Sequence, residues 1–286
     1  MSVIVAQGPG LGPDAVAELA LELEAAWEAC DGFHLLTPEV FPTPVRLEEL
    51  RVEYLCDLNP VPAGFVSSAV ELLVSDMDST LIGIECVDEI ADFAGVKEEV
   101  ARITEAAMRG DLDFQGALRE RVRLLAGLPE TVLERVWEER LRLNPGAVAL
   151  VDAARRRGVK TAVVSGGFTF FTERLKACLG LDFALANRLE VKDGKLTGEV
   201  LGEIVDGRVK ARFLRETCER LGIEPSQAVA VGDGANDLPM MMEAGLGVAY
   251  HAKPKVRARA HWAINYNGLE AVVPALVLDE CLSRTG

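Results

Sequence analysis

The sequence predicts an α/β fold built on a doubly wound parallel sheet, because short apolar segments alternate with helical patterns along most of the chain. Four apolar segments have the length of buried strands: Glu71–Ser75, Val159–Val164, Ala228–Gly232 and Leu246–Tyr250. Three helical patterns each end at a glycine, the residue preferred just after a helix: Asp152–Arg157, Phe170–Leu179 and Lys210–Leu221. Strands joined by helices in this way predict right-handed crossovers.

Two internal segments depart from this alternation. Leu189–Lys192 and Lys195–Val200 flank Asp193-Gly194, a pair typical of a type I′ turn, and therefore predict a β-hairpin. Residues 85–144 carry helical periodicity and many charges, with no strand pattern. We expect them to form a helical cap inserted into a core made of residues 65–84 and 145–286.

Residues 1–64 precede the core, and we expect them to form a small N-terminal module. The sequence does not indicate its role. The pattern favours a strand at Val3–Ala6, a helix over Asp14–Cys30 and a strand at Leu50–Cys56. Pro60–Gly64 has the composition of a linker, which places the boundary of the module there.

The composition of the chain disfavours several classes of protein and of binding partner. The chain has 286 residues and a formal net charge of −15, which disfavours binding to nucleic acid or to an anionic membrane. No segment approaches the roughly 20 apolar residues of a membrane span, and Met1–Gly10 lacks the features of a signal peptide. None of the six cysteines forms a Cys-x-x-Cys pair. We therefore expect a cytoplasmic protein with reduced thiols.

Acidic residues follow two of the predicted strands. Asp76 and Asp78 come after the first, and Asp233 and Asp237 come after Ala228–Gly232. The carboxyl ends of parallel strands meet at one edge of a sheet, so these carboxylates could together hold a hard divalent cation. Each pair alone could equally be part of an ordinary turn or helix cap. Two such turns on one sheet favour the metal site.

Two further features suit an anion. Ser165-Gly166-Gly167 follows a predicted strand and precedes a helix, where a hydroxyl and free backbone N–H groups can bind phosphate. Val163 stands where a nucleophile elbow requires glycine, so we interpret Ser165 as a ligand and not as a nucleophile. Lys210 could neutralise a phosphoryl group, although taken alone it is typical of a solvated surface lysine.

In chain order, these motifs resemble those of the haloacid-dehalogenase (HAD) superfamily. They are Asp-x-Asp-x-Thr at 76–80, Ser165, Lys210 and Gly-Asp-Gly-x-Asn-Asp at 232–237. Further segments are similar to the phosphoserine phosphatases of that superfamily: Glu85–Ile90, Met108–Gly110, Phe114, Arg121, Ser165–Phe168, Ala186–Leu189 and His251–Lys255. The resemblance covers about residues 71–265 and implies a HAD-like Rossmannoid core.

The resemblance implies Mg²⁺-dependent hydrolysis of O-phospho-L-serine to L-serine and phosphate, the last step of serine biosynthesis. Asp76 would be the nucleophile and form an aspartyl-phosphate, while Asp78 would act as general acid and then general base. Asp76, the Asp78 backbone carbonyl and Asp233 would hold the metal ion, and Asp237 would support them from behind.

The family pattern also assigns the substrate contacts. Phosphoryl ligands would be Ser165, the N–H of Gly166, Lys210 and Asn236. In the cap, Glu85 would bind the ammonium and Arg121 the carboxylate of phosphoserine. Met108 and Phe114 would form the apolar wall of a lid that excludes water.

Two other functions remain compatible with the sequence. One is a phosphotransferase of the same fold that passes phosphate from phosphoserine to another alcohol. The other is a receiver-like switch without enzymatic activity, which the acid at position 78 and the helical cap disfavour. The expected partner is the small-molecule substrate, and the oligomeric state stays open, a homodimer included.

Overall fold

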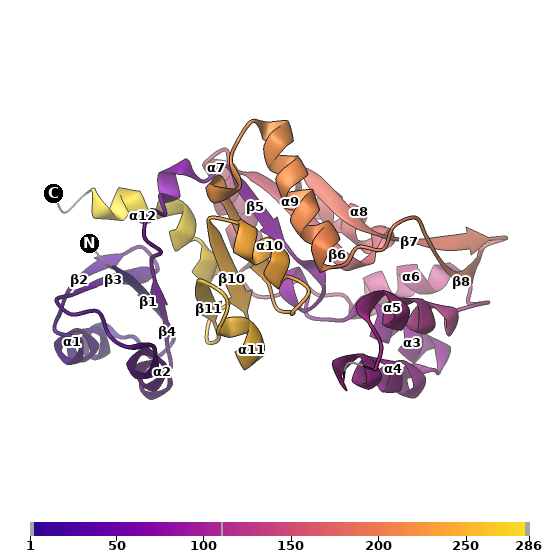
Figure 1. Cartoon of the computed structure of the whole chain (residues 1–286), viewed down its shortest axis with the longest axis horizontal. Coiled ribbons are helices and arrows are strands. Elements are labelled where there is room, and N and C mark those ends of the chain that lie inside the picture. Colours follow the sequence, from indigo (N-terminus) through magenta and orange to yellow (C-terminus); the bar gives the residue numbers. More distant parts are fainter. Residues whose placement is uncertain (1–2, 110, 284–286) are drawn as a thin grey trace.

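The computed structural model describes residues 3–109 and 111–283, apart from the side chains of Met108 and Arg109. Two sheets carry the fold, a large one of seven strands and a small one of four (Figure 1). The large sheet has the strand order β11-β10-β9-β5-β6-β7-β8. Within the described ranges, no helix is long and apolar enough to cross a membrane.

The large sheet confirms the predicted α/β class. All neighbouring strands from β11 to β7 run parallel. The four predicted strands are present as β5 (Leu72–Ser75), β6 (Lys160–Phe168), β9 (Ala228–Gly232) and β10 (Leu246–Tyr250). The sheet continues through β11 (Trp262–Ile264) on one side and β7 (Phe183–Lys192) on the other.

Helices cover both faces of the large sheet, which explains why its central strands are continuously apolar. On β5, Leu73 packs into one core cluster, whereas Leu72 and Val74 pack into another on the opposite face. The first face is covered by α7 (Ala147–Arg156) and α8 (Thr169–Leu179). The second is covered by α9 (Gly207–Leu221) and α10 (Leu238–Glu243). Short helical turns lie at Ser67–Ala69, Met77–Leu81, Pro225–Gln227, Pro254–Arg257 (α11) and Leu269–Val272.

The predicted hairpin is also present, formed by β7 and the edge strand β8 (Lys195–Leu201). Asp193 and Gly194 both have positive φ, 50° and 71°, as a type I′ turn requires.

Residues 85–144 contribute only helices to the named elements of the described chain: α3 (Cys86–Ala94), α4 (Lys97–Arg109), α5 (Phe114–Arg123), α6 (Thr131–Arg135) and a π-helical turn (Val136–Arg140). In Figure 1 these helices gather beside the β7–β8 hairpin. An isolated β-bridge joins Pro129 to Lys195, and Gly198 lies against the backbone of Arg123, so the hairpin is one support of this helical group.

The N-terminal module has the order of elements β1-α1-β2-β3-α2-β4, and its antiparallel strands lie in the order β2-β3-β1-β4. This is a ferredoxin-like arrangement. Its elements are β1 (Ile4–Gln7), α1 (Pro13–Glu22), β2 (Ala25–Cys30), β3 (Phe33–Pro38), α2 (Pro44–Glu53) and β4 (Asp57–Pro60).

Two N-terminal predictions were wrong. The predicted helix Asp14–Cys30 ends at Glu22, because Glu24 adopts a left-handed conformation with φ of 47° and the chain then turns back as β2. The predicted strand Leu50–Cys56 lies mostly in α2, which begins with Pro44 after a Thr43 cap. The first strand, expected at Val3–Ala6, is confirmed as β1.

The module docks onto the last strand of the large sheet through side chains of β4. The carboxylate of Asp57 accepts a hydrogen bond from the Asn265 N–H at 2.7 Å, and the Asn59 Oδ1 accepts one from Ala263 N–H at 2.9 Å. Trp262 Nε1 donates to the Pro60 carbonyl at 2.9 Å. The bond to Asn59 satisfies a backbone N–H on the open edge of β11, and together the three bonds join the two sheets.

A disulfide contradicts the expectation that all cysteines are reduced. Cys30, at the end of β2, is bonded to Cys281 in α12 (Pro274–Leu282), whereas Cys56, Cys86, Cys178 and Cys218 are free. The two bonded residues are 251 positions apart in sequence. Only the docking of the module against α12 brings them together, and no local spacing could have indicated the pair.

Candidate active site

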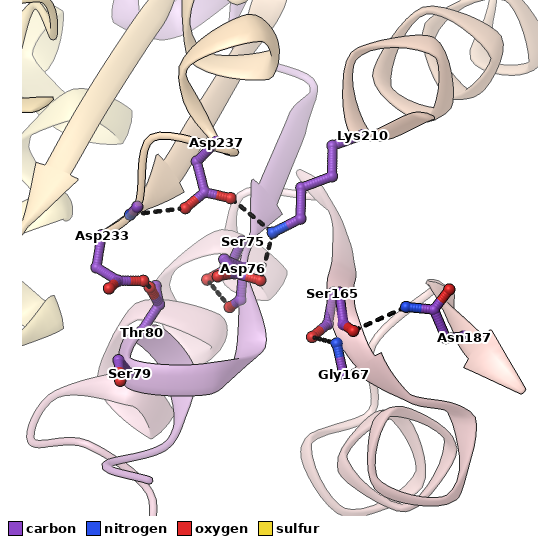
Figure 2. Close-up of polar contacts among 12 residues, drawn as sticks. Ser75, Asp76, Ser79, Thr80, Ser165, Gly167, Asn187, Lys210, Asp233 and Asp237 are labelled. Carbon is purple, nitrogen blue, oxygen red and sulfur yellow. Dashed lines mark hydrogen bonds and ion pairs between the residues drawn. The ribbon is translucent and has the colours of Figure 1, made fainter. Parts of the chain in front are cut away.

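Three carboxylates meet at the carboxyl end of the large sheet. Asp76 directly follows β5, Asp233 directly follows β9, and Asp237 precedes α10. The Asp76 N–H donates to the Val231 carbonyl at 2.9 Å, which fixes the two strand ends side by side. One oxygen from each of the three carboxylates lies within 4.8 Å of the others. Figure 2 shows the three side chains in one view. The strand-end acids that the sequence pointed to are therefore brought together.

Lys210 lies behind Asp76 and does not face the open cavity. Its side chain is fully buried, and its Nζ donates to Asp76 Oδ1 and to Asp237 Oδ1, both at 2.6 Å (Figure 2). Burial alone would lower the pKa of Lys210, but the carboxylates of Asp237 and Asp76 raise it, so the ammonium stays charged. This cation holds the Asp76 side chain in one orientation.

Both carboxylate oxygens of Asp237 make contacts within the protein. One oxygen accepts from Lys210 and the other accepts the Gly234 N–H at 2.9 Å. A Cβ at position 232 would lie 2.4 Å from Asp237 Cγ, so only glycine fits there. Asp233 instead accepts from Thr80 Oγ1 at 3.2 Å and borders the cavity, as does Asp76. Within the acidic cluster, Asp76 and Asp233 are therefore the residues that face the cavity.

Asp78 lies in the turn after β5, next to the first cap helix. Its Oδ1 accepts a hydrogen bond from the Cys86 N–H at 3.3 Å, which satisfies the first free amide of α3. Burial and the negative charge of Glu85 raise the pKa of Asp78 to about 7. Burial and the charge of Asp237 raise the pKa of Asp233 to about 6. The raised pKa of Asp78 keeps a protonated fraction of this residue available near neutral pH.

The Ser165-Gly166-Gly167 segment lies within β6 and not at the start of a helix, which corrects the sequence-based expectation. β6 continues to Phe168, and α8 begins only at Thr169. The pairing of β6 with β7 shifts register between Val164 and Phe168, so the three residues form a bulge-like curve. Asn187 Nδ2 donates to the Gly166 carbonyl at 2.7 Å, and the Gly167 N–H donates to Ser165 Oγ at 2.8 Å.

A cavity of about 160 Å³ opens above these groups. Core residues form its floor: Asp76, Asp78, Ser165, Gly166, Gly167, Phe168, Asp233, Gly234 and Asn236. Cap residues form its other wall: Glu85, Val87, Phe114, Leu118 and Arg121. A Cβ at Gly166 would meet Phe114 Cζ at 2.8 Å, so the two walls approach closely.

Some lining residues were not predicted, among them Val87, Leu118 and Phe168. Leu118 could have been found, because it lies four residues after Phe114 and three before Arg121 on α5 and therefore shares their helix face. The side chain of Met108, predicted to line the lid, lies outside the described residues.

The cap wall presents opposite charges to the cavity. Glu85 accepts a hydrogen bond from Ser79 Oγ at 2.7 Å. Burial lowers the pKa of Arg121, while the charges of Asp88 and Glu85 raise it, and the side chain remains a cation. A bound molecule therefore meets carboxylates at the floor and one charge of each sign at the cap.

The family model for haloacid dehalogenase-like hydrolases matches residues 73–242, which is more than half of the chain. The chain belongs to the haloacid dehalogenase-like hydrolases. This hydrolase is 57% identical to a phosphoserine phosphatase from Polaromonas sp. over 211 residues, which cover 72% of this chain and 89% of that protein. The oxygen donors of Asp76, Asp233 and Asp237 suit a hard divalent cation, as expected for a metal-dependent member of the family.

Solved structures similar to the hydrolase extend the match to the N-terminal module. A HAD family hydrolase from Salmonella enterica serovar Typhi superposes with a TM-score of 0.88 at 34% identity, over 98% of this chain and 99% of that one. A probable phosphoserine phosphatase from Vibrio cholerae superposes with a TM-score of 0.84 at 40% identity, over 99% of this chain and 88% of that one.

Proposed function

We propose that this hydrolase is a Mg²⁺-dependent phosphoserine phosphatase that converts O-phospho-L-serine to L-serine and phosphate in serine biosynthesis. The observation that carries the proposal is the cavity itself. It combines Asp76 and Asp78 on its floor with Glu85 and Arg121 on its cap wall, so phosphoryl chemistry and recognition of an amino acid share one space. The names of the similar enzymes support the same substrate.

In the first step, a carboxylate oxygen of Asp76 attacks the phosphorus atom and the bond from phosphorus to the serine oxygen breaks. Lys210 keeps Asp76 oriented for this attack through its 2.6 Å contact. Asp78 donates its proton to the departing serine oxygen, and its raised pKa, about 7, keeps a protonated fraction available near neutral pH. The products are an aspartyl-phosphate on Asp76 and serine, whose side-chain oxygen is now a neutral hydroxyl.

In the second step, Asp78 accepts a proton from a water molecule that attacks the aspartyl-phosphate. The bond between phosphorus and the Asp76 oxygen breaks, which releases phosphate and restores the carboxylate. One residue serves as acid and then as base, so both steps depend on the position of Asp78 relative to the turn and to α3.

Charge on the transferring group would be balanced from several sides. Mg²⁺, held by Asp76, Asp233 and the Asp78 backbone carbonyl, would supply positive charge close to the phosphoryl oxygens. Ser165, the Gly166 N–H and Asn236 border the cavity and would bind the remaining oxygens. Asp237 would support the site indirectly through Lys210 and Gly234.

The helices of residues 85–144 would act as the cap that selects the substrate. Arg121 presents a planar, always-charged group suited to the carboxylate of phosphoserine, and Glu85 has the sign that suits its ammonium. Phe114, with Met108 as an expected neighbour, would close the apolar side and exclude water.

The test is phosphate release from O-phospho-L-serine by the purified protein, before and after exhaustive treatment with EDTA. We expect activity that disappears with chelation and returns with added Mg²⁺. Full activity after chelation would contradict the metal assignment, and phosphate transferred to an added alcohol in preference to water would identify a phosphotransferase instead.

A further inference from the structure

Ser79 ties the catalytic turn to the first residues of the cap, and neither the family resemblance nor the proposed chemistry assigns it a role. Its N–H donates to the Ile84 carbonyl at 3.2 Å, and its Oγ donates to Glu85 Oε1 at 2.7 Å. Beside them, the Cys86 N–H donates to Asp78 at 3.3 Å. Three hydrogen bonds thus close the short loop between Asp78 and the start of α3.

Ser79, which contacts Glu85 through its hydroxyl, has an unusual backbone conformation. Its φ is 55°, a left-handed conformation that costs energy for any residue other than glycine. Glycine would remove that cost, but it has no hydroxyl. The presence of serine at a position suited to glycine indicates that the hydroxyl contributes something that offsets the strain.

The Glu85 side chain is available to Ser79 because it does not cap its own helix. Glu85 occupies the N-cap position of α3 yet makes no side-chain cap hydrogen bond, and Asp78 accepts the first amide of the helix instead. Glu85 lines the cavity, and among the described residues the Ser79 hydroxyl donates a hydrogen bond to its carboxylate. Without that hydroxyl the carboxylate would lose its fixed orientation.

We propose that Ser79 is a positioning residue for substrate specificity, holding Glu85 in the orientation that binds the substrate ammonium. This inference rests on the proposed function, since it concerns the amino group of phosphoserine. Ser79 acts through Glu85 and not on the phosphoryl group, so its loss weakens the preference for amino-acid substrates more than the chemistry itself.

The experiment compares Ser79→Gly with the wild type on O-phospho-L-serine and on p-nitrophenyl phosphate, which has no ammonium. Glycine accepts the left-handed backbone conformation, so we expect the variant to fold while it loses the hydroxymethyl group that contacts Glu85. We expect the ratio of the two kcat/KM values to fall about fivefold to tenfold, which lies within the range of one ordinary intramolecular hydrogen bond. The change should come from a rise in KM for phosphoserine.

Two controls make the result specific. Thr197→Val removes a hydroxyl that donates to Glu190 at 2.8 Å, the same kind of bond on the β7–β8 hairpin, and should leave the ratio unchanged. In a Glu85→Ala background, Ser79→Gly should have no further effect on the ratio, because the two residues act as a pair.

The outcomes separate the two proposals. An unchanged ratio in Ser79→Gly, or an equal loss with and without Glu85, overturns the positioning role while leaving phosphoserine hydrolysis intact. A wild-type protein that releases no phosphate from phosphoserine rejects the proposed function, and this inference with it.

Discussion

The two sheets of the molecule differ in what they contribute to the cavity. The large sheet is parallel, and the ends of β5, β6 and β9 supply the floor of the cavity. The small sheet is antiparallel, and none of its described residues lines that cavity. Its edge strand β4 instead supplies buried polar side chains, Asp57 and Asn59, to the last strand of the large sheet. The cavity lies where parallel strands end together, as ligand sites of such sheets do. The described residues of the antiparallel module contact the core but do not line the cavity.

The strongest test of this division is Asp76→Asn. We expect turnover of phosphoserine to fall by about 10⁴-fold or more, because one side chain serves as both the proposed nucleophile and a proposed metal ligand. The amide keeps the shape of the side chain, so the melting temperature should change little. Asp57→Asn in the module is the matched acid-to-amide control, and its turnover should stay within about threefold of wild type. A similar loss in both variants would remove the distinction between the two sheets.

Removing a charged side chain from the cap wall should have the second-largest effect on phosphoserine hydrolysis. Arg121→Ala and Glu85→Ala each leave a substrate charge unmatched in a closed site, at about 2–5 kcal/mol. KM for phosphoserine should rise, while p-nitrophenyl phosphate should be much less affected. If both substrates lost equally, these residues would serve the fold or the phosphoryl site and not the recognition of the amino acid.

The disulfide should affect stability and not turnover. Cys281→Ser removes the covalent link between the module and α12, and we expect the free energy of unfolding in urea to fall by about 2–4 kcal/mol. Cys178→Ser, at an exposed free cysteine, is the control. Peptide mapping without reductant should recover Cys30 and Cys281 in one linked fragment. Recovery of both as free thiols would contradict the bond.

The smallest expected effects are on how stability depends on pH. The contributions of Asp57, in β4 of the small sheet, and of Asp182, just before β7 of the large sheet, should change with pH in opposite directions. Burial raises the pKa of Asp57 above its ordinary value of 3.8, so its contribution to stability is largest at low pH and falls as pH rises. The pKa of Asp182 is lowered: burial opposes this, but Lys160 and the Thr161 N–H outweigh it. Its contribution is present above pH 3.8 and falls as the solution is acidified.

Urea unfolding of Asp57→Asn and Asp182→Asn at pH 4 and pH 7 checks this prediction. Relative to wild type, Asp57→Asn should lose more at pH 4, and Asp182→Asn should lose more at pH 7, by about 1 kcal/mol or less. The same pH dependence in both variants would mean that burial of Asp57 does not govern its ionisation.

The large sheet could be predicted from sequence for a physical reason. Strands covered on both faces, such as β5 and β9, are continuous apolar segments that stand out from their surroundings. Their acidic ends could be located for the same reason. In contrast, β2 has exposed positions at Ala26, Trp27 and Ala29 and directly follows a helix, so its pattern merged with that of α1.

Other features could not be predicted because they depend on tertiary contacts. Lys210 has the sequence context of a surface lysine, yet it is fully buried between two carboxylates. The bond between Cys30 and Cys281 and the contact between Ser79 and Glu85 likewise depend on how separate segments meet. For Glu85, Arg121 and Asn236, only the family pattern indicated which of many polar residues face the cavity.

The docking of β4 against β11 also bears on how the chain reaches its final structure during synthesis. The partner of Asp57, the N–H of Asn265, is added 208 residues later. At ribosomal rates of about 5–20 residues per second, this interval is roughly 10–40 s. Throughout it, the module can complete its own sheet, but Asp57 and Asn59 have no partner on the core and stay hydrated. A segment that emerges early is therefore among the last to gain its permanent contacts, and β11 and α12 complete the molecule by covering it.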